Sequence, residues 1–248
     1  MSGRRVVITG GASGMGAALV AALSDSDAQV LSLDITEPEG ERVAAAAGAA
    51  FLRCDVTDKD SVDRAFAEGV RALGGLDVLI HAAGIAPSSP AESTPMSMWE
   101  STMAVNATGT FLTNQAAFEH LRERGGRIIN FASAAGAKGL PGKAAYAASK
   151  GAVLGWTRTV AVEWAKHGIT VNAIAPAIRT PMYEKTRASM TSEQLAAHDQ
   201  HLTTLIPLGG KLGKVEDLVP VLEFIAGEGS RFMTGQIFAV DGGSLMVR

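Results

Sequence analysis

Two side chains that could exchange a proton, the phenol of Tyr146 and the ammonium of Lys150, stand four residues apart in the alanine-rich stretch GKAAYAASKGA. Such a stretch predicts a helix, and this spacing puts both side chains on one helix face, with Cβ atoms about 5 to 6 Å apart. An ammonium about 5 Å from a phenol, at an effective dielectric constant of about 20, favours the phenolate by roughly 3 kcal/mol and lowers its pKa by about 2. The pair is either a general acid/base or two solvated neighbours.

Ser133 and Asn106 are the polar side chains that could complete such a site. Ser133 ends an apolar segment just before the expected helix, where its hydroxyl can donate to a developing alkoxide. Capping a helix or turn is its competing role. Asn106 stands in MAVNATGTF, a helical pattern whose interior disfavours asparagine. Its presence there indicates either a functional position or a buried polar bridge.

A glycine-rich turn, TGGASGMG at residues 9–16, follows the first apolar segment and precedes an alanine-rich helical pattern. Glycines let the backbone approach a diphosphate closely, and a helix N-terminus supplies free N–H groups and partial positive charge. The spacing is not G-x-G-x-x-G, and a tight turn with close packing is the competing interpretation. The glycines concerned are Gly10, Gly14 and Gly16.

Two aspartates follow the next two apolar segments. Asp34, about 20 residues beyond the turn, can accept hydrogen bonds from an adenosine ribose. Its carboxylate would repel a 2′-phosphate and the turn contains no arginine, so we expect NAD rather than NADP. Asp55, in CDVTD, either bonds the adenine amino group or caps the next helix. Thr57 or Asp58 could equally provide that cap.

Seven short apolar segments alternate with helical patterns, and this predicts an α/β, doubly wound parallel sheet with helices on both faces. In such a sheet ligands bind beyond the carboxyl ends of the strands. The segments are RRVVIT, AQVLSLD, AAFLRCD, LDVLIHAAG, GRIINFAS, GITVNAIAP and GQIFAVDGG. Residues 178–213 break the alternation with no clear strand or helix, and their position after a strand end predicts a substrate lid.

Composition limits the remaining possibilities. The 248 residues contain no linker and no repeat, so we expect one domain spanning 1–248. The formal charge of −3 and the lack of a basic block argue against nucleic acid and membranes as partners. A lone cysteine, Cys54, and an N-terminus without an apolar leader favour the cytoplasm. His198 and His201 stand three residues apart with no third ligand near, so we assign no metal.

With TGGASGMG, DVTD, HAAG, Asn106, Ser133 and YAASK in this order, the chain resembles the short-chain dehydrogenase/reductase family over nearly its whole length. The resemblance implies one Rossmann-type domain of about seven parallel strands, NAD(P) binding and reversible oxidation of an alcohol. It implies that Tyr146 is the catalytic acid/base and that Lys150 lowers its pKa and holds the nicotinamide ribose. It also implies that Ser133 binds the substrate oxygen, that Asn106 supports a water-linked proton relay, and that the protein is a homotetramer.

The resemblance extends to a set of contact residues. Thr180 would bond the nicotinamide carboxamide. Cofactor contacts are expected at Gly10, Ser13, Gly14, Met15, Gly16, Asp34, Ile35, Asp55, Val56, Ala82, Ala83, Gly84, Tyr146, Lys150, Pro176, Ala177, Ile178 and Thr180. Substrate contacts are expected at Ser133, Leu140, Tyr146, Met182 and Tyr183.

Two positions depart from the family pattern. His81-Ala82-Ala83-Gly84 stands where the family usually has Asn-Ala-Ala-Gly. Because His81 replaces the asparagine, it is in question whether it takes over the stabilising role of that residue. The usual Pro-Gly reads Pro176-Ala177, which adds a methyl group beside the expected nicotinamide.

The favoured function is an NAD-dependent dehydrogenase for a secondary alcohol or ketone, with an apolar substrate indicated by the Met- and Leu-bearing lid. An NADPH-dependent 3-oxoacyl thioester reductase that uses acyl carrier protein is the alternative, and Asp34 speaks against it. A non-catalytic nucleotide-binding protein would have no need for Ser133, Tyr146 and Lys150.

Overall fold

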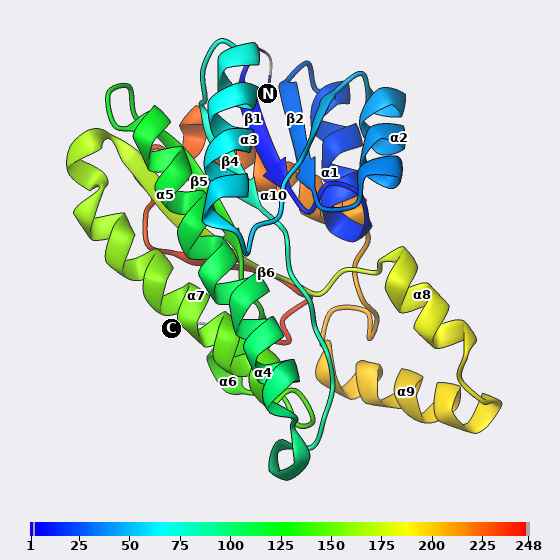
Figure 1. Cartoon of the computed structure of the whole chain (residues 1–248). Helices are drawn as coiled ribbons and strands as arrows, with labels where there is room; N and C mark the ends of the chain where they lie inside the picture. Colours follow the sequence, from blue (N-terminus) through cyan, green and yellow to red (C-terminus); the bar gives the residue numbers. More distant parts are fainter. Residues whose placement is uncertain (2, 247–248) are drawn as a thin grey trace.

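The computed structural model describes residues 1 and 3–246, apart from the side chains of Met182 and Thr186. Its centre is a seven-stranded sheet in the order β3-β2-β1-β4-β5-β6-β7, in which every neighbouring pair is parallel (Figure 1). The predicted α/β doubly wound class is therefore confirmed. The strands are β1 (Arg5–Thr9), β2 (Gln29–Asp34), β3 (Ala50–Arg53), β4 (Val78–His81), β5 (Gly126–Phe131), β6 (Ile169–Pro176) and β7 (Ile237–Val240).

Helices cover both faces of the sheet, because alternate strand residues point to opposite sides. Val7 and Leu79 pack with α3 (Lys59–Ala72), α5 (Gly109–Leu121) and α7 (Ala144–Glu163). Val6 and Ile80 pack with α1 (Gly14–Asp25), α2 (Glu37–Ala47) and α10 (Val215–Ala226). Both faces are apolar, which explains why the strands read as nearly continuous apolar runs.

The order of the strands reverses between β1 and β4, which lie side by side in the centre of the sheet. The chain leaves β1 toward β2 and leaves β4 toward β5, so the loops after these strands diverge and leave room for a ligand. Gly10 sits at this point with φ +73°, and a Cβ there would lie 2.8 Å from the backbone of Ala83. Only glycine satisfies both conditions.

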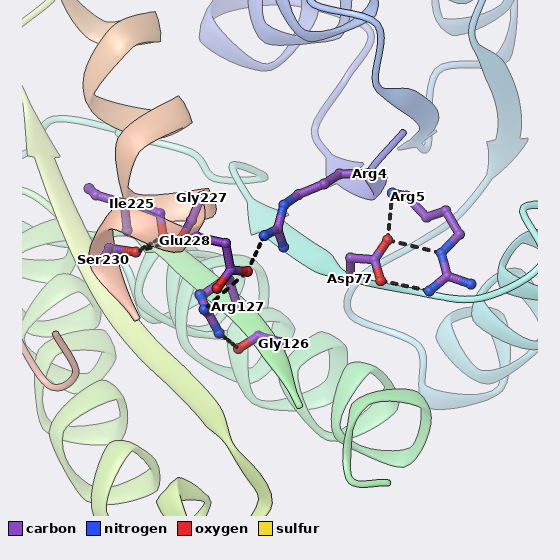
Figure 2. Close-up of polar contacts among 9 residues, drawn as sticks. All are labelled: Arg4, Arg5, Asp77, Gly126, Arg127, Ile225, Gly227, Glu228 and Ser230. Carbon is purple, nitrogen blue, oxygen red and sulfur yellow. Dashed lines mark hydrogen bonds and ion pairs between the residues drawn. The ribbon is translucent and has the colours of Figure 1, made fainter. Parts of the chain in front are cut away.

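Ion pairs join the opposite, amino end of the sheet (Figure 2). Asp77 accepts from the Arg5 backbone and Nε at 2.9 Å each and from Nη2 at 2.6 Å, which ties β1 to the start of β4. Glu228, in the short helix η4 (Glu228–Ser230), contacts Arg4 and lies 3.7 Å from Arg127 Nη2 on β5. Because these groups lie at the other end of the strands from the ligand edge, they hold the sheet together rather than form its site.

The segment from 178 to 213 is not the irregular stretch that its sequence indicates. It contains α8 (Pro181–Ala188) and α9 (Ser192–Leu205), which project together from the body of the sheet (Figure 1). Thr191 and Gln194 form a reciprocal capping box at the start of α9. Tyr183 and His198, 2.8 Å apart, join the two helices.

The remaining helical segments lie between the strands. They are η1 (Ala91–Ser93), α4 (Met96–Met103), the π-helical segment η2 (Ala104–Thr108), α6 (Ala134–Lys138) and η3 (Ala165–His167). Within the described residues, the helices include none that is long and apolar enough to cross a membrane.

Candidate active site

Ser133 and Tyr146 meet beyond the carboxyl end of β5. The Ser133 hydroxyl accepts from the Ala135 N–H at 3.1 Å and so caps α6. The same hydroxyl lies close enough to the phenol to act to lower the pKa of Tyr146. Ser133 therefore fills the capping role, and the cap holds its hydroxyl near the phenol; its role toward a substrate oxygen stays a prediction.

Lys150 stands one turn beyond Tyr146 on α7, with its Nζ 5.9 Å from the centroid of the tyrosine ring. Its side chain is buried, and its ammonium donates to the Phe131 carbonyl at 2.6 Å. Burial lowers the pKa of Lys150 to about 8. Predicting the two as a same-face pair was right.

The pKa of Tyr146 runs against the expectation drawn from this spacing. Burial raises the pKa above the ordinary value of 10, and this outweighs the lowering effect of the Ser133 contact. The helical spacing predicts the Lys150 ammonium as the dominant influence on this pKa, whereas desolvation of the phenolate is the largest effect in the folded protein. Further positive charge near the phenol is therefore needed to lower the pKa of Tyr146 toward 7.

Asn106 lies in the π-helical segment η2 between α4 and α5, fully buried. Its Oδ1 accepts from Ile85 N at 2.8 Å, and its Nδ2 donates to Ile85 O and to Ser149 Oγ at 2.9 Å each. The side chain is thus a polar bridge between the segment after β4 and helix α7. A Cβ on the neighbouring Gly84 would lie 3.1 Å from Asn106 Oδ1 and 3.4 Å from Lys150 Nζ, so these groups converge.

His81 belongs to a polar layer beneath the site. Its Nδ1 lies 2.9 Å from Thr9 Oγ1 on β1 and 2.9 Å from Thr113 Oγ1 on α5. Thr9 Oγ1 also accepts from Ala83 N at 3.2 Å, which holds the segment after β4 in place. Burial, with a smaller effect of the Lys150 charge, lowers the pKa of His81 to about 3. A neutral His81 therefore connects β1, β4 and α5 where the family pattern has asparagine.

The glycine-rich turn fits a diphosphate. A Cβ on Gly16 would lie 2.0 Å from the Gly10 carbonyl oxygen, so the inner side of the turn is closed. Gly14 has φ +58° and nothing within 4 Å of such a Cβ, so the outer side is open at the first residue of α1. Ser13 occupies the N-cap position without a capping side-chain bond. The free N–H groups of α1 are therefore available to an anionic ligand, with Met15 in the same first turn.

The two aspartates of the adenosine end have different local roles. Asp34 accepts from Ala12 N at 3.0 Å and from Thr36 N at 2.9 Å, so it braces the glycine-rich turn as well as facing the ligand edge. Asp55 accepts from the backbone and hydroxyl of Thr57 through one oxygen, at 2.9 and 2.7 Å. The cap of α3 is Asp58, as one of the alternatives held, so Asp55 is not the cap. Of their neighbours, Ile35 is exposed and Val56 is nearly buried.

The segment after β6 is fixed by its backbone. The Ala177 N–H donates to the Val240 carbonyl at 2.9 Å. Ile178 is buried in the core and forms an isolated β-bridge with Gly213. Thr180 Oγ1 accepts from Tyr183 N at 3.2 Å and so starts α8. A hydroxyl that accepts in this way keeps its proton for a ligand such as a carboxamide.

The expected substrate residues are not gathered in one place. Leu140 is 45% exposed on the loop before α7. The Tyr183 hydroxyl is bound to His198, so it faces α9, and the described contacts do not bring it to Tyr146. The side chain of Met182 lies outside the described residues. Ser133, Tyr146, Lys150 and Asn106 are the candidate residues that the fold does bring together.

Lys143 is a residue near the site that the sequence argument missed. It precedes Tyr146 by three residues, and its ammonium donates to the Ala86 carbonyl, while Ser89 N donates to the Gly142 carbonyl at 3.0 Å. These bonds join the segment after β4 to the start of α7. Burial lowers the pKa of Lys143. Its spacing of one helical turn from Tyr146 was the signal that could have drawn attention to it.

Comparison with known proteins agrees with this geometry. The sequence profile of the family described as "Enoyl-(Acyl carrier protein) reductase" matches residues 10–244. The chain is 36% identical to 2,5-dichloro-2,5-cyclohexadiene-1,4-diol dehydrogenase of Sphingobium indicum, over 98% of this chain and 97% of that protein. It is 34% identical to NAD-dependent glycerol dehydrogenase of Listeria innocua, over 96% and 92%. A short-chain type dehydrogenase/reductase from Mycobacterium ulcerans is similar in structure, with a TM-score of 0.91, 26% identity, and coverage of 98% of this chain and 91% of that one.

Proposed function

Because the chain belongs to the short-chain dehydrogenase/reductase family, we propose that it interconverts a secondary alcohol and a ketone with NAD(H). The similar proteins described above include dehydrogenases of a cyclic diol and of glycerol, which supports this proposal. The observation that carries the proposal is the joining of Ser133, Tyr146 and Lys150 at the same sheet edge as the open turn around Gly14. A nicotinamide, when bound, accepts or returns the hydride. The protein must then manage the proton and the oxygen.

Tyr146 holds or accepts the proton at its phenol oxygen in this proposal. The Ser133 hydroxyl, fixed by its cap on α6, hydrogen-bonds the substrate oxygen beside that phenol. The Lys150 ammonium, 5.9 Å from the centroid of the tyrosine ring, stabilises negative charge on the phenol and would hold the nicotinamide ribose. Asn106 keeps the segment after β4 and helix α7 in register through Ile85 and Ser149, and supports the relay of the proton away from Lys150.

We assign NAD as the cofactor and NADP as the weaker ligand. Asp34 presents a carboxylate at the end of β2, where an adenosine ribose would be bound, and its repulsion of a 2′-phosphate supports this assignment. The cofactor contacts predicted from the sequence remain the proposed set. An NADPH-dependent 3-oxoacyl thioester reductase is the alternative that Asp34 disfavours, and a non-catalytic nucleotide-binding protein is disfavoured by the Ser133 to Tyr146 contact.

The proposal also covers the domain organisation, the class of substrate, the cell compartment and the oligomeric state. We propose a single domain of residues 1–248, in which residues 178–213 form the substrate lid through α8 and α9. The substrate is a small, largely apolar alcohol or ketone, and the protein works in the cytoplasm without nucleic acid or membrane. A homotetramer is supported by exposed apolar side chains on α4 and α5, among them Met96, Trp99 and Phe111.

The experiment is a panel of secondary alcohols, including cyclic diols, glycerol and 3-hydroxyacyl thioesters, tested with NAD and with NADP by absorbance of the reduced cofactor. We expect turnover with NAD on at least one member. Tyr146→Phe should lower that turnover at least 100-fold while the Kd for NADH changes less than about 3-fold, because the variant loses a proton-transfer group and little binding. Unchanged turnover in this variant removes Tyr146 from the mechanism, and tighter binding of NADPH than of NADH reverses the cofactor assignment.

A further inference from the structure

A cavity of about 520 Å³ connects the glycine-rich turn with the segment that follows β6. Ser13, Gly14 and Arg179 line it, together with mostly apolar side chains of α1 and α2. Among the described residues, its charged lining side chains are Glu39, Arg42 and Arg179. Glu39 and Arg42 are paired with each other at 2.6 Å, whereas Glu184, the partner of Arg179, does not line the cavity, so Arg179 supplies the excess positive charge of the wall. The turn itself contains no arginine, and the fold brings this one in from 165 residues further along the chain.

Arg179 combines a fixed backbone with a movable side chain. Its N–H donates to the Gly213 carbonyl at 2.8 Å. Its Nε donates to Glu184 at 2.6 Å, and the two side chains are 43% and 46% exposed. An ion pair with this exposure contributes little to stability, because water screens it. Glu184 can therefore be replaced at low cost by an acceptor that carries more charge.

We propose that Arg179 binds the diphosphate of the dinucleotide in exchange for Glu184, an inference that rests on the nucleotide binding in the proposed function. A guanidinium donates two parallel hydrogen bonds to phosphate oxygens, and a diphosphate carries more negative charge than one carboxylate. The N–H groups at the start of α1, where Ser13 and Gly14 line the same cavity, would serve the same ligand.

The exchange links the nucleotide to the lid. Glu184 lies in the first turn of α8, whose start is held by the Thr180 cap and by the Arg179 ion pair. When Arg179 turns to the diphosphate, Glu184 is released and one of the two ties at the start of α8 is lost. Nucleotide binding thereby changes a contact at the start of α8, the first helix of the proposed lid, while the Thr180 cap remains.

The test measures Kd values for NADH by its fluorescence, and for ADP-ribose and adenosine by competition with NADH. Arg179→Met should weaken NADH and ADP-ribose about 10-fold, because a charge-assisted hydrogen bond is lost, and should change adenosine less than about 2-fold, because adenosine has no phosphate. Glu184→Gln should tighten NADH by about 3-fold, because the competing carboxylate is gone. Lys185→Met removes one positive charge from an exposed position of the same helix and should leave all three Kd values within about 2-fold.

Equal NADH affinity in Arg179→Met and the unaltered protein overturns the inference while leaving the nucleotide site intact. Unchanged or weaker binding by Glu184→Gln overturns the exchange. A larger loss for NADPH than for NADH in Arg179→Met also overturns it, because the arginine would then bind a 2′-phosphate. An unaltered protein that binds neither NADH nor NADPH contradicts the proposed function itself. Arg179→Gln, measured beside Arg179→Met, serves the same purpose if the Met variant does not fold.

Discussion

The ammonium of Lys150 lies 5.9 Å from the centroid of the Tyr146 ring, and both groups have pKa values moved by burial toward their uncharged forms. Burial lowers the pKa of Lys150 to about 8 and raises that of Tyr146. The protein alone therefore keeps the phenol protonated at neutral pH. In the proposed function this state suits the reduction of a ketone, in which Tyr146 would give a proton, whereas oxidation would need added positive charge beside the phenol.

The buried charge of Lys150 should appear in the pH dependence of stability. Its pKa is about 8 in the folded chain against 10.5 as the ordinary value, so the unfolded chain binds the proton more strongly between these pH values, and raising the pH stabilises the fold. The difference corresponds to about 3 kcal/mol at most. Urea unfolding at pH 7.5 and 10 should show that the free energy of unfolding of the unaltered protein rises, relative to that of Lys150→Met, as the pH increases over this range. A stability difference that is independent of pH would contradict the prediction, and the exposed Lys166→Met serves as the control for surface charge.

His81 should make the fold sensitive to acid in a lower pH range. Its pKa is about 3 in the folded chain and about 6.5 when unfolded, so its contribution is complete above pH 6.5 and is lost as the pH falls toward 3. At pH 5 the loss is about 2 kcal/mol relative to pH 7. His81→Asn removes this term and keeps a polar group near Thr9 and Thr113, so its stability should fall less between pH 7 and 5. Equal losses in both proteins would show that His81 is not the titrating group.

Asp34 should influence both the turn and the choice of cofactor. Asp34→Asn keeps an oxygen for one of the two backbone N–H groups and removes the negative charge. We expect the ratio of the NADPH Kd to the NADH Kd to fall at least about 10-fold, because the repulsion of the 2′-phosphate is gone. Asp34→Ala should show the same change with a further loss of about 1 kcal/mol in unfolding free energy. Asp55→Asn is the matched control, and an equal change in that variant would remove the special role of Asp34.

Asp77 should stabilise the amino end of the sheet. Its three bonds to Arg5 lower the pKa of the carboxyl group, so its contribution is present above the ordinary value of 3.8 and is lost as the pH falls through the lowered value. Asp77→Asn should cost about 1 kcal/mol at pH 7, with turnover unchanged because the pair lies far from the ligand edge. Asp63→Asn, which removes an exposed helix pair with Lys59, should cost less than about 0.5 kcal/mol. An equal cost at both positions would assign no special stabilisation to Asp77.

Local patterns in the sequence were sufficient for the strands, for the polar and glycine residues at their carboxyl ends, and for the same-face spacing of Tyr146 and Lys150. The two helices of residues 178–213 were harder to predict, because α8 and α9 have weak amphipathic patterns and are held by contacts such as Tyr183 to His198. The capping residues Thr191 and Gln194 were the local signal that α9 exists. The role of Asn106, either functional or as a buried polar bridge, could not be predicted from local patterns, because its partners Ile85 and Ser149 lie 21 and 43 residues away in the sequence.

The sequence by itself determined the α/β class, the glycine-rich turn and the side chains available for proton transfer, because periodicity, glycine placement and helical spacing act over a few residues. Tertiary structure alone decided the direction of the Tyr146 pKa, the neutral state of His81 and the presence of Arg179 in the same cavity as Ser13 and Gly14. Desolvation and partner choice depend on residues that are distant in the chain. They are defined only when the sheet has assembled around them.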